Sequence, residues 1–177
     1  MNIKNEPILR GKSLILRDAE IEDSDFLLSL RLDPLKSRFL SKTSPSKEKQ
    51  IAWMRHYKER RDQAYFVIED RLSERLGCVR MYDPTPTSFV WGSWLIVDGA
   101  SPHVALESAL LIYSYARRLG FKTAKLDVRQ KNKNVWKFHE RVFGAVLVRQ
   151  DRIDRFYELD DSLIDKNLHI YRGLLNT

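Results

Sequence analysis

The chain of 177 residues carries a net charge of +7, from 31 lysines and arginines against 24 aspartates and glutamates. This length suits a single domain, 1–177, that buries a full core without disulfides or metals. The basic residues are dispersed, with no run of five and no zinc-finger or RNA-binding signature, so we expect no nucleic-acid partner. An anionic small molecule accounts for the charge equally well.

The single cysteine, Cys78, lies in the apolar run LGCVRMY, where a buried structural thiol is expected. One cysteine cannot form an intrachain disulfide, which fits a reducing compartment. No apolar run is long enough for a signal peptide or a membrane span. We therefore expect a cytoplasmic protein, monomeric or homodimeric, without a membrane partner or a bound metal.

Hydrophobic periodicity and turn residues predict alternating strands and helices along the chain. The predicted elements are a strand at 13–17, a helix beginning at Asp23 or Ser24 and ending before Pro34, a short helix or loop at 35–43, a helix at 47–61, strands at 64–69, 76–83 and 88–97, a helix at 103–120, a strand at 123–129, a helix at 131–143, strands at 145–151 and 153–159, and a helix at 162–175. A strand–helix–strand crossover makes its two strands parallel. This order predicts a mixed α/β fold, with a mostly antiparallel sheet, one βαβ crossover and flanking helices.

The predicted strand at 88–97 contains a glycine and two tryptophans. Gly92 interrupts the strand, as glycines do at a β-bulge or where another group approaches the backbone closely. Trp91 and Trp94 are three residues apart, so strict alternation predicts opposite faces of the sheet. We expect one tryptophan in the core and the other at a cleft.

Two segments and the order of elements resemble the GNAT superfamily of acetyl-CoA-dependent N-acetyltransferases. The opening SLILRDAEIEDSDFLLSLRLDP is similar to the first strand and helix of the branches that acetylate ribosomal proteins and sugar amines. The segment QKNKNVWKFHERVFGA is similar to the family's asparagine-containing turn, helix and glycine. The resemblance covers nearly the whole chain. It implies a GNAT-like fold, an acyltransferase activity and acetyl-CoA as co-substrate.

The resemblance also implies a set of cofactor-binding residues. Ile96 and Val97 correspond to the strand whose backbone pairs with the pantetheine arm in the family. Asn132 and Asn134 lie where the family places an asparagine that binds the cofactor. An asparagine after a strand is also an ordinary turn or capping residue.

The loop at 98–105, DGASPHVA, corresponds to the family's glycine-rich loop, which holds the CoA pyrophosphate on backbone N–H groups at a helix N-terminus. The repeated glycines are absent here. Ser101 can cap the helix or hold a phosphate oxygen, and His103, Val104 and Ala105 offer backbone donors. A simple Ser-Pro helix start is the alternative.

By resemblance, His139 stands where many relatives carry the tyrosine that protonates the departing CoA thiolate. A histidine can donate a proton near neutral pH. His139 also lies on an apolar helix face, which is typical of a core histidine. The strand at 88–97 has no glutamate to serve as general base, so Asp83, Asp127, a water relay or solvent remain the candidates.

The early helices and the edge of the central strand are expected to form the acceptor side, with candidate residues Arg38, Trp53, Tyr57, Ser93 and Trp94. An arginine beside an aromatic ring suits the phosphate and base of a nucleotide sugar, and packing with surface charge is the alternative for each residue. The predicted reaction moves acetyl from acetyl-CoA to a primary amine on a nucleotide-linked amino sugar. A protein N-terminus is a second acceptor. A non-catalytic acyl-CoA-binding domain is the third alternative, favoured by the missing glycines and glutamate.

Overall fold

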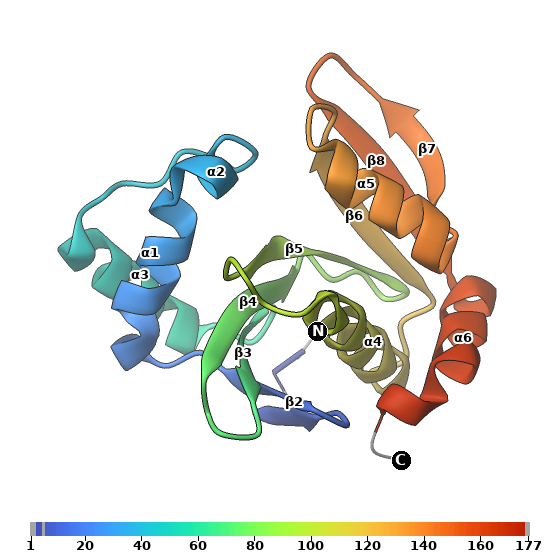
Figure 1. Cartoon of the computed structure of the whole chain (residues 1–177), viewed down its shortest axis with the longest axis horizontal. Coiled ribbons are helices and arrows are strands. Elements are labelled where there is room, and N and C mark those ends of the chain that lie inside the picture. Colours follow the sequence, from blue (N-terminus) through green and yellow to red (C-terminus); the bar gives the residue numbers. More distant parts are fainter. Residues whose placement is uncertain (1–2, 5, 176–177) are drawn as a thin grey trace.

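The computed structural model describes residues 3–4 and 6–175 and contains one eight-stranded sheet in the order β1-β2-β3-β4-β5-β6-β8-β7 (Figure 1). The elements, in chain order, are β1 (Ile8–Arg10), β2 (Leu14–Asp18), η1 (Ile21–Asp23), α1 (Ser24–Leu32), α2 (Pro34–Ser37), α3 (Lys47–Glu59), β3 (Ala64–Asp70), β4 (Arg75–Tyr82), β5 (Ser88–Ile96), α4 (Pro102–Arg118), β6 (Thr123–Arg129), α5 (Lys133–Phe138), η2 (His139–Phe143), β7 (Val146–Gln150), β8 (Asp154–Asp160), α6 (Asp161–Ile170) and η3 (Arg172–Leu174).

The sheet confirms the predicted mixed topology. Strands β5 and β6 run parallel across the α4 crossover, and every other neighbouring pair of strands is antiparallel. The β3–β4 and β7–β8 hairpins follow the predicted pairings. The strand β1 was not predicted, because three residues carry too little periodicity to be recognised in a sequence.

The helix ends lie close to the predicted boundaries. Helix α1 ends at Leu32, two residues before Pro34, and Pro34 itself begins α2. Ser46 caps α3 by accepting a hydrogen bond from the Lys49 N–H at 3.2 Å. The predicted helix at 131–143 is a short α5 that continues into η2, a π-helical turn ending at the left-handed Gly144. In the part of the chain that the structure describes, no helix is long and apolar enough to cross a membrane.

Helices cover both faces of the sheet. The helices α1 and α3 pack on one face, where Leu27, Met54 and Val67 share a cluster of buried side chains. The helix α4 packs on the other face with η2 and α6, in a larger cluster. Figure 1 shows α1, α2 and α3 gathered on one side of the molecule and α5, β7 and β8 on the other. The central strands therefore lie between two groups of elements.

The parallel pair separates soon after it begins. Strand β5 pairs with β6 only from Ser88 to Val90, and the edge of β5 beyond Val90 has no strand partner among the described residues. On its other edge, β5 contains an extra residue opposite β4, because Cys78 pairs with Leu95 and Arg80 pairs with Gly92. Ser93 in this bulge has a φ of 47°.

The bulge corrects the prediction for the two tryptophans. Their ring centroids lie 5.4 Å apart, so Trp91 and Trp94 share one face of the sheet. The extra residue shifts the alternation of side chains by one position. Gly92 indicated a bulge in the sequence, and the bulge places Trp94 on the same face as Trp91. Both indoles belong to the core or pack against it.

Candidate active site

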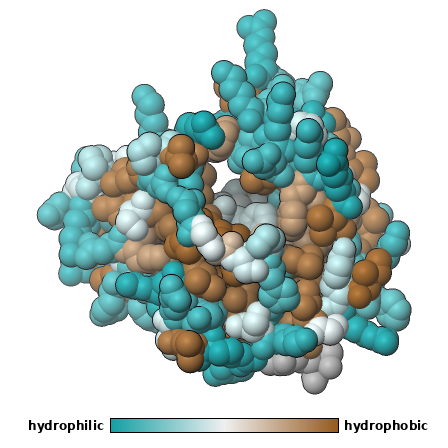
Figure 2. Space-filling view, in the orientation of Figure 1, coloured by the Kyte–Doolittle hydropathy of each residue, from teal (hydrophilic) through white to brown (hydrophobic). Residues whose placement is uncertain are grey.

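A cavity of about 590 Å³ lies where β5 and β6 separate. We call it the inter-strand cavity. It is lined by residues 91–96 of β5, residues 126–129 of β6, Asp98, most of residues 35–40, and Asn132, Asn134, Val135 and His139 around α5. Figure 2 shows the surface hollowed between the side that carries α2 and the side that carries α5. The cavity brings together seven predicted site residues from distant parts of the chain, namely Arg38, Ser93, Trp94, Ile96, Asn132, Asn134 and His139.

Asn132 precedes α5 at its N-cap position. Its side chain makes no capping hydrogen bond, although asparagine caps helices readily. The backbone carbonyl of Asn132 accepts from the Trp136 N–H at 3.3 Å, which anchors the helix start without the amide. The amide side chain therefore remains available to the inter-strand cavity.

His139 begins the π-helical turn and is only 2% exposed. Four aromatic rings, those of Trp91, Trp94, Phe138 and Phe143, lie with their centroids 5.3 to 6.3 Å from the imidazole. Burial among these rings lowers the pKa of His139 to about 3. Its Nδ1 atom is buried and has no hydrogen-bond partner within the described residues. His139 is therefore a neutral imidazole at the wall of the inter-strand cavity.

The loop before α4 forms a capped helix start. Ser101 Oγ accepts a hydrogen bond from the His103 N–H at 3.3 Å, and the Ser101 carbonyl accepts from the Val104 N–H at 2.9 Å. The His103 ring is directed to the buried carboxylate of Glu107, with Nε2 at 2.8 Å from Oε2. The residues 101–105 are not among those lining the inter-strand cavity. Val97, the residue after β5, donates its N–H to the Leu76 carbonyl of β4 at 2.9 Å and does not line the inter-strand cavity.

A second cavity, of about 430 Å³, lies on the α1–α3 side of the sheet. We call it the basic cavity because, among the described residues, four cationic side chains and no carboxylate line it. Its lining residues are the cations Arg31, Lys42, Lys49 and Arg80, the aromatic residues Trp53, Tyr65 and Tyr82, and the polar residues Ser41, Thr43, Ser44, Gln50 and Ser93. Ser93 lines both cavities, so the bulge of β5 separates them.

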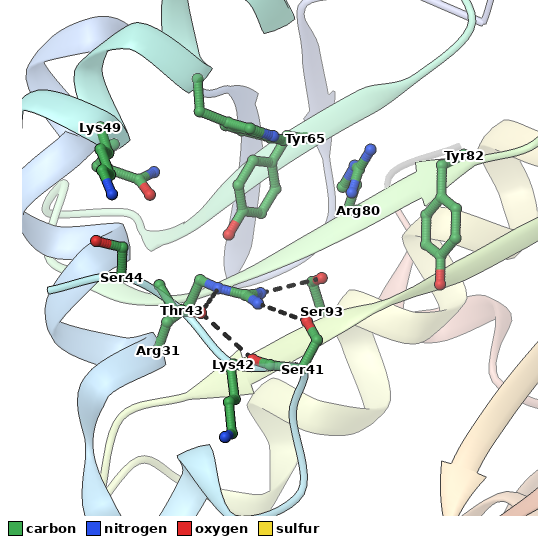
Figure 3. A pocket seen from close by; sticks show the side chains of 12 residues that line it. Arg31, Ser41, Lys42, Thr43, Ser44, Lys49, Tyr65, Arg80, Tyr82 and Ser93 are labelled. Carbon is green, nitrogen blue, oxygen red and sulfur yellow. Dashed lines mark hydrogen bonds between the residues drawn. The ribbon is translucent and has the colours of Figure 1, made fainter. Parts of the chain in front are cut away.

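The two arginines of the basic cavity are held by neutral groups. Arg31 donates from Nε to Thr43 Oγ1 at 2.8 Å, and more weakly from its other nitrogens to Ser41 Oγ and Ser93 Oγ. Figure 3 shows this guanidinium reaching from α1 toward Ser93, with Tyr65, Arg80 and Tyr82 extending from the neighbouring strands. Cationic groups oriented in this way, without a neighbouring carboxylate, have the chemistry to contact an anion.

Arg80 lies between two aromatic rings, with its guanidinium carbon 5.3 Å from the Trp53 centroid and 4.9 Å from the Tyr82 centroid. Its Nε donates to Gln63 Oε1 at 2.8 Å. Burial lowers the pKa of Arg80, because water is largely replaced by rings around the charge. An anion entering this cavity would compensate that charge.

Two predicted acceptor residues lie outside the inter-strand cavity. Trp53 lines the basic cavity and is 36% exposed. Tyr57 is completely buried, donates to Asp18 Oδ1, and accepts from the Tyr65 N–H at 2.8 Å. The structure therefore places Tyr57 in the core beneath Trp53, whose ring stacks on it at 5.8 Å.

Sequence reasoning missed most of the basic cavity. Arg31, Arg80 and Tyr82 were not predicted as site residues, although Arg80 and Tyr82 alternate with the buried Val79 and Met81 along one strand. That alternation indicates which face they occupy, but not that α1 lies opposite. The pairing of Arg31 with Ser93 spans 62 residues of sequence and is set by the tertiary fold.

Comparisons with known proteins identify the family and the fold of the chain. Residues 13–142 match the family described as Acetyltransferase (GNAT) domain. The apo structure of FdhC, described as a nucleotide-linked sugar GNAT, is similar with a TM-score of 0.86 and 31% identity, covering 96% of this chain and 98% of that one. A search among curated proteins gives no match.

Two further structures are similar in fold alone. Spermidine N-acetyltransferase SpeG from Vibrio cholerae, solved as a variant, has a TM-score of 0.72 and 15% identity, covering 85% of this chain and 95% of that one. RimL, a ribosomal alpha-N-protein acetyltransferase, has a TM-score of 0.72 and 17% identity, covering 86% and 93%. Proteins named for a polyamine, a protein and a nucleotide-linked sugar thus share the architecture, so the architecture by itself does not select an acceptor.

Proposed function

Because this chain belongs to the GNAT acetyltransferase family, we propose that it transfers acetyl from acetyl-CoA to an amino group on a nucleotide-linked sugar. The inter-strand cavity is the proposed site of the thioester, and the basic cavity is the proposed site of the acceptor. Ser93, which lines both cavities, marks their junction.

Three features of the inter-strand cavity fit acetyl-CoA. The free edge of β5 beyond Val90 offers backbone groups to an extended chain of amides, as when a peptide adds to a sheet edge. The Asn132 amide is not used as a cap. The buried Nδ1 of His139 lacks a partner among residues 3–4 and 6–175, which suits a polar ligand atom. Bound acetyl-CoA would supply the activated acetyl group.

We assign His139 a role that differs from the acid predicted from the sequence. A ring with a pKa of about 3 carries no proton to give as imidazolium at neutral pH. A neutral imidazole still has one N–H donor and one acceptor nitrogen. His139 therefore serves as a fixed hydrogen-bonding group beside the reacting thioester, while its aromatic neighbours exclude water.

The residues of the basic cavity support the proposed acceptor class. Its four cations match a diphosphate group, and Trp53, Tyr65 and Tyr82 offer rings to a sugar or base. The same charge repels a polyamine, which carries several positive charges. The likeness to FdhC, described as a nucleotide-linked sugar GNAT, supports the same acceptor class.

A thiol-release assay with acetyl-CoA tests this function. The acceptor panel holds nucleoside diphosphate-linked amino sugars, the same amino sugars without the nucleotide, peptides with a free N-terminus, and spermidine. We expect turnover with the nucleotide-linked amino sugars, and at least a tenfold lower kcat/KM without the nucleotide. Turnover with peptides alone would instead assign a protein N-terminus as the acceptor. Turnover with spermidine alone would overturn the proposal that the basic cavity binds an anionic acceptor.

A binding experiment separates the cofactor from the acceptor. Acetyl-CoA should raise Tm in the absence of any amine, because a ligand specific for the folded state stabilises it. A Tm shift without thiol release from any acceptor would indicate a binding domain. No Tm shift at millimolar acetyl-CoA would contradict the assignment of the inter-strand cavity.

A further inference from the structure

The boundary between the two cavities contains a carboxylate, that of Asp127, that has no ion-pair partner among the described residues. On β6, Ala124, Leu126 and Val128 are buried in the core cluster shared with α4, so Asp127 points to the opposite face. That face is the one on which the basic cavity lies, because Arg80 and Tyr82 alternate with core residues on β4 in the same way. Asp127 also lines the inter-strand cavity. It is therefore exposed where an acceptor would meet the thioester.

Tyr82 connects Asp127 with both cavities. Its side chain lines the basic cavity, and its hydroxyl lies over Gly92, where an added Cβ would be 3.1 Å from Oη. Gly92 itself lines the inter-strand cavity. Burial raises the pKa of Tyr82 to about 12, and the negative charge of Asp127 contributes to the increase. The carboxylate and the phenol thus face the same space.

Only two carboxylates on described residues line either cavity, and they differ in their partners. Asp98 forms an ion pair with Lys36, with Oδ1 2.8 Å from Nζ. Asp127 has no ion pair or side-chain hydrogen bond to the described residues, since Arg129 on its own strand binds Asp154 of β8 at 2.7 Å. Asp83 lines neither cavity. Of the carboxylates considered from the sequence, Asp127 is therefore the free one at the junction.

We propose that Asp127 is the general base that removes the proton from the acceptor amine. This inference rests on the proposed transfer of acetyl to an amine. The carboxylate takes one proton from the substrate ammonium, which frees the nitrogen lone pair. As the C–N bond forms, the C–S bond breaks with its electron pair on sulfur, and the second nitrogen proton passes to that sulfur. Asp127 then releases its proton to solvent, leaving an amide and a thiol.

The surroundings of Asp127 suit a base. The charged and titratable groups that face it are Tyr82 on β4, Arg129 on β6 and Asp154 on β8. The Asp127 side chain is exposed to the cavities, but the surrounding chain still shields it partly from water. This partial desolvation and then the charge of Asp154 raise the pKa of Asp127, and Arg129 opposes this increase. A base with a raised pKa accepts a proton more readily near neutral pH. Because the base must be ionised, kcat/KM should fall as pH decreases through its pKa.

Four proteins test the assignment, namely wild type and the variants Asp127→Asn, Asp127→Glu and Asp83→Asn. The assay uses acetyl-CoA with a nucleoside diphosphate-linked amino sugar. General-base catalysis is worth roughly 100- to 10,000-fold, so Asp127→Asn should lower kcat by that amount. The dissociation constant of acetyl-CoA should stay within about twofold, since the change affects proton transfer rather than binding. Asp127→Glu should recover part of the rate, and Asp83→Asn should behave as wild type.

A fourth variant and a measurement without substrate complete the test. Asp154→Asn removes a negative charge and releases Arg129, and both effects lower the pKa of Asp127, so the acidic limb of the pH profile should move to lower pH. Carbon-13 NMR of the carboxyl groups in the ligand-free protein should show Asp127 titrating above an ordinary aspartate. If wild type turns over and Asp127→Asn has the same kcat, or if Asp127 titrates like an ordinary aspartate, only the assignment of Asp127 as the base is overturned. A wild type that releases no thiol with any amine would instead overturn the proposed function.

Discussion

Arg31 on α1 donates a hydrogen bond of 2.8 Å from Nε to Thr43 Oγ1, in the segment between α2 and α3. The hydroxyl orients the guanidinium without neutralising it, because a hydroxyl carries no charge. The orientation of Arg31 therefore depends on a segment with no regular structure, residues 38–46. Binding of an anion to Arg31 would couple this segment to α1.

Replacing Arg31 by methionine should weaken binding of the acceptor and leave binding of acetyl-CoA unchanged. Hydrogen bonds to charged groups contribute about 1.5–3 kcal/mol, so KM for a nucleotide-linked amino sugar should rise roughly 10- to 100-fold. KM for acetyl-CoA should remain near the wild-type value. The matched control is Arg55→Met, which removes an exposed arginine of α3 outside both cavities. An equal loss with an uncharged small amine as acceptor would show that Arg31 does not recognise the nucleotide.

His139 should make stability depend on pH in a defined direction. Its folded-state pKa of about 3 lies below the ordinary value of 6.5, so the unfolded state binds a proton that the folded state does not. Stability is therefore fully present above pH 6.5 and decreases as pH falls toward 3. Between pH 7 and pH 5 the loss amounts to about 2 kcal/mol.

The variant His139→Phe isolates this effect. Urea unfolding at pH 7 and pH 5 should show the variant gaining about 2 kcal/mol relative to wild type at the lower pH. The control Phe138→Leu changes packing beside the same ring without a titrating group, and its free-energy difference should stay constant. At pH 7 the variant His139→Phe should stay folded with a lower kcat. Wild-type turnover in this variant would place His139 in the core without a catalytic role.

The elements of the sheet were predictable, because each rests on local periodicity and capping residues. The α4 crossover, for example, is fixed by an apolar helix between two strand-like segments, which forces β5 and β6 to be parallel. The divergence of those strands was not predictable, since it depends on where pairing stops. Nor was the shared face of Trp91 and Trp94, because a bulge of one residue reverses every later side chain.

The two cavities also differ in how far the sequence predicts their lining residues. Asn132 and His139 could be identified in one contiguous segment that resembles a family. The cations of the basic cavity come from α1, α3, β4 and a loop, and none belongs to a local motif. Their juxtaposition is a property of the tertiary fold.

Asn132→Ala should separate binding from folding. The Asn132 side chain makes no capping bond, so the free energy of unfolding should change by less than about 0.5 kcal/mol. Loss of one hydrogen bond to acetyl-CoA should raise its dissociation constant by about 3- to 10-fold. The control Ser46→Ala removes a side chain that does cap α3, and should lose about 1 kcal/mol of stability with unchanged acetyl-CoA affinity. An unchanged dissociation constant in Asn132→Ala would remove this residue from the site.

Glu107 should be the most costly carboxylate to neutralise. It is completely buried in α4, and its oxygens accept from the Ser13 N–H at 2.8 Å, the Leu14 N–H at 2.9 Å and the Ser13 hydroxyl at 2.5 Å. His103 Nε2 lies 2.8 Å from the same carboxylate. These contacts join the first turns of α4 to the start of β2.

Glu107→Gln removes the negative charge and replaces one accepting oxygen by an NH₂ group that is itself a donor, so either the Ser13 hydroxyl or the Ser13 and Leu14 N–H groups lose the acceptor that they have in the wild type. The free energy of unfolding should fall by about 2–4 kcal/mol in urea, since bonds to a charged group are lost and a polar group is left buried. The control Glu59→Gln neutralises an exposed carboxylate at the end of α3 and should change stability by less than about 0.5 kcal/mol. Equal stability of the two variants would show that the buried carboxylate does not hold β2 against α4.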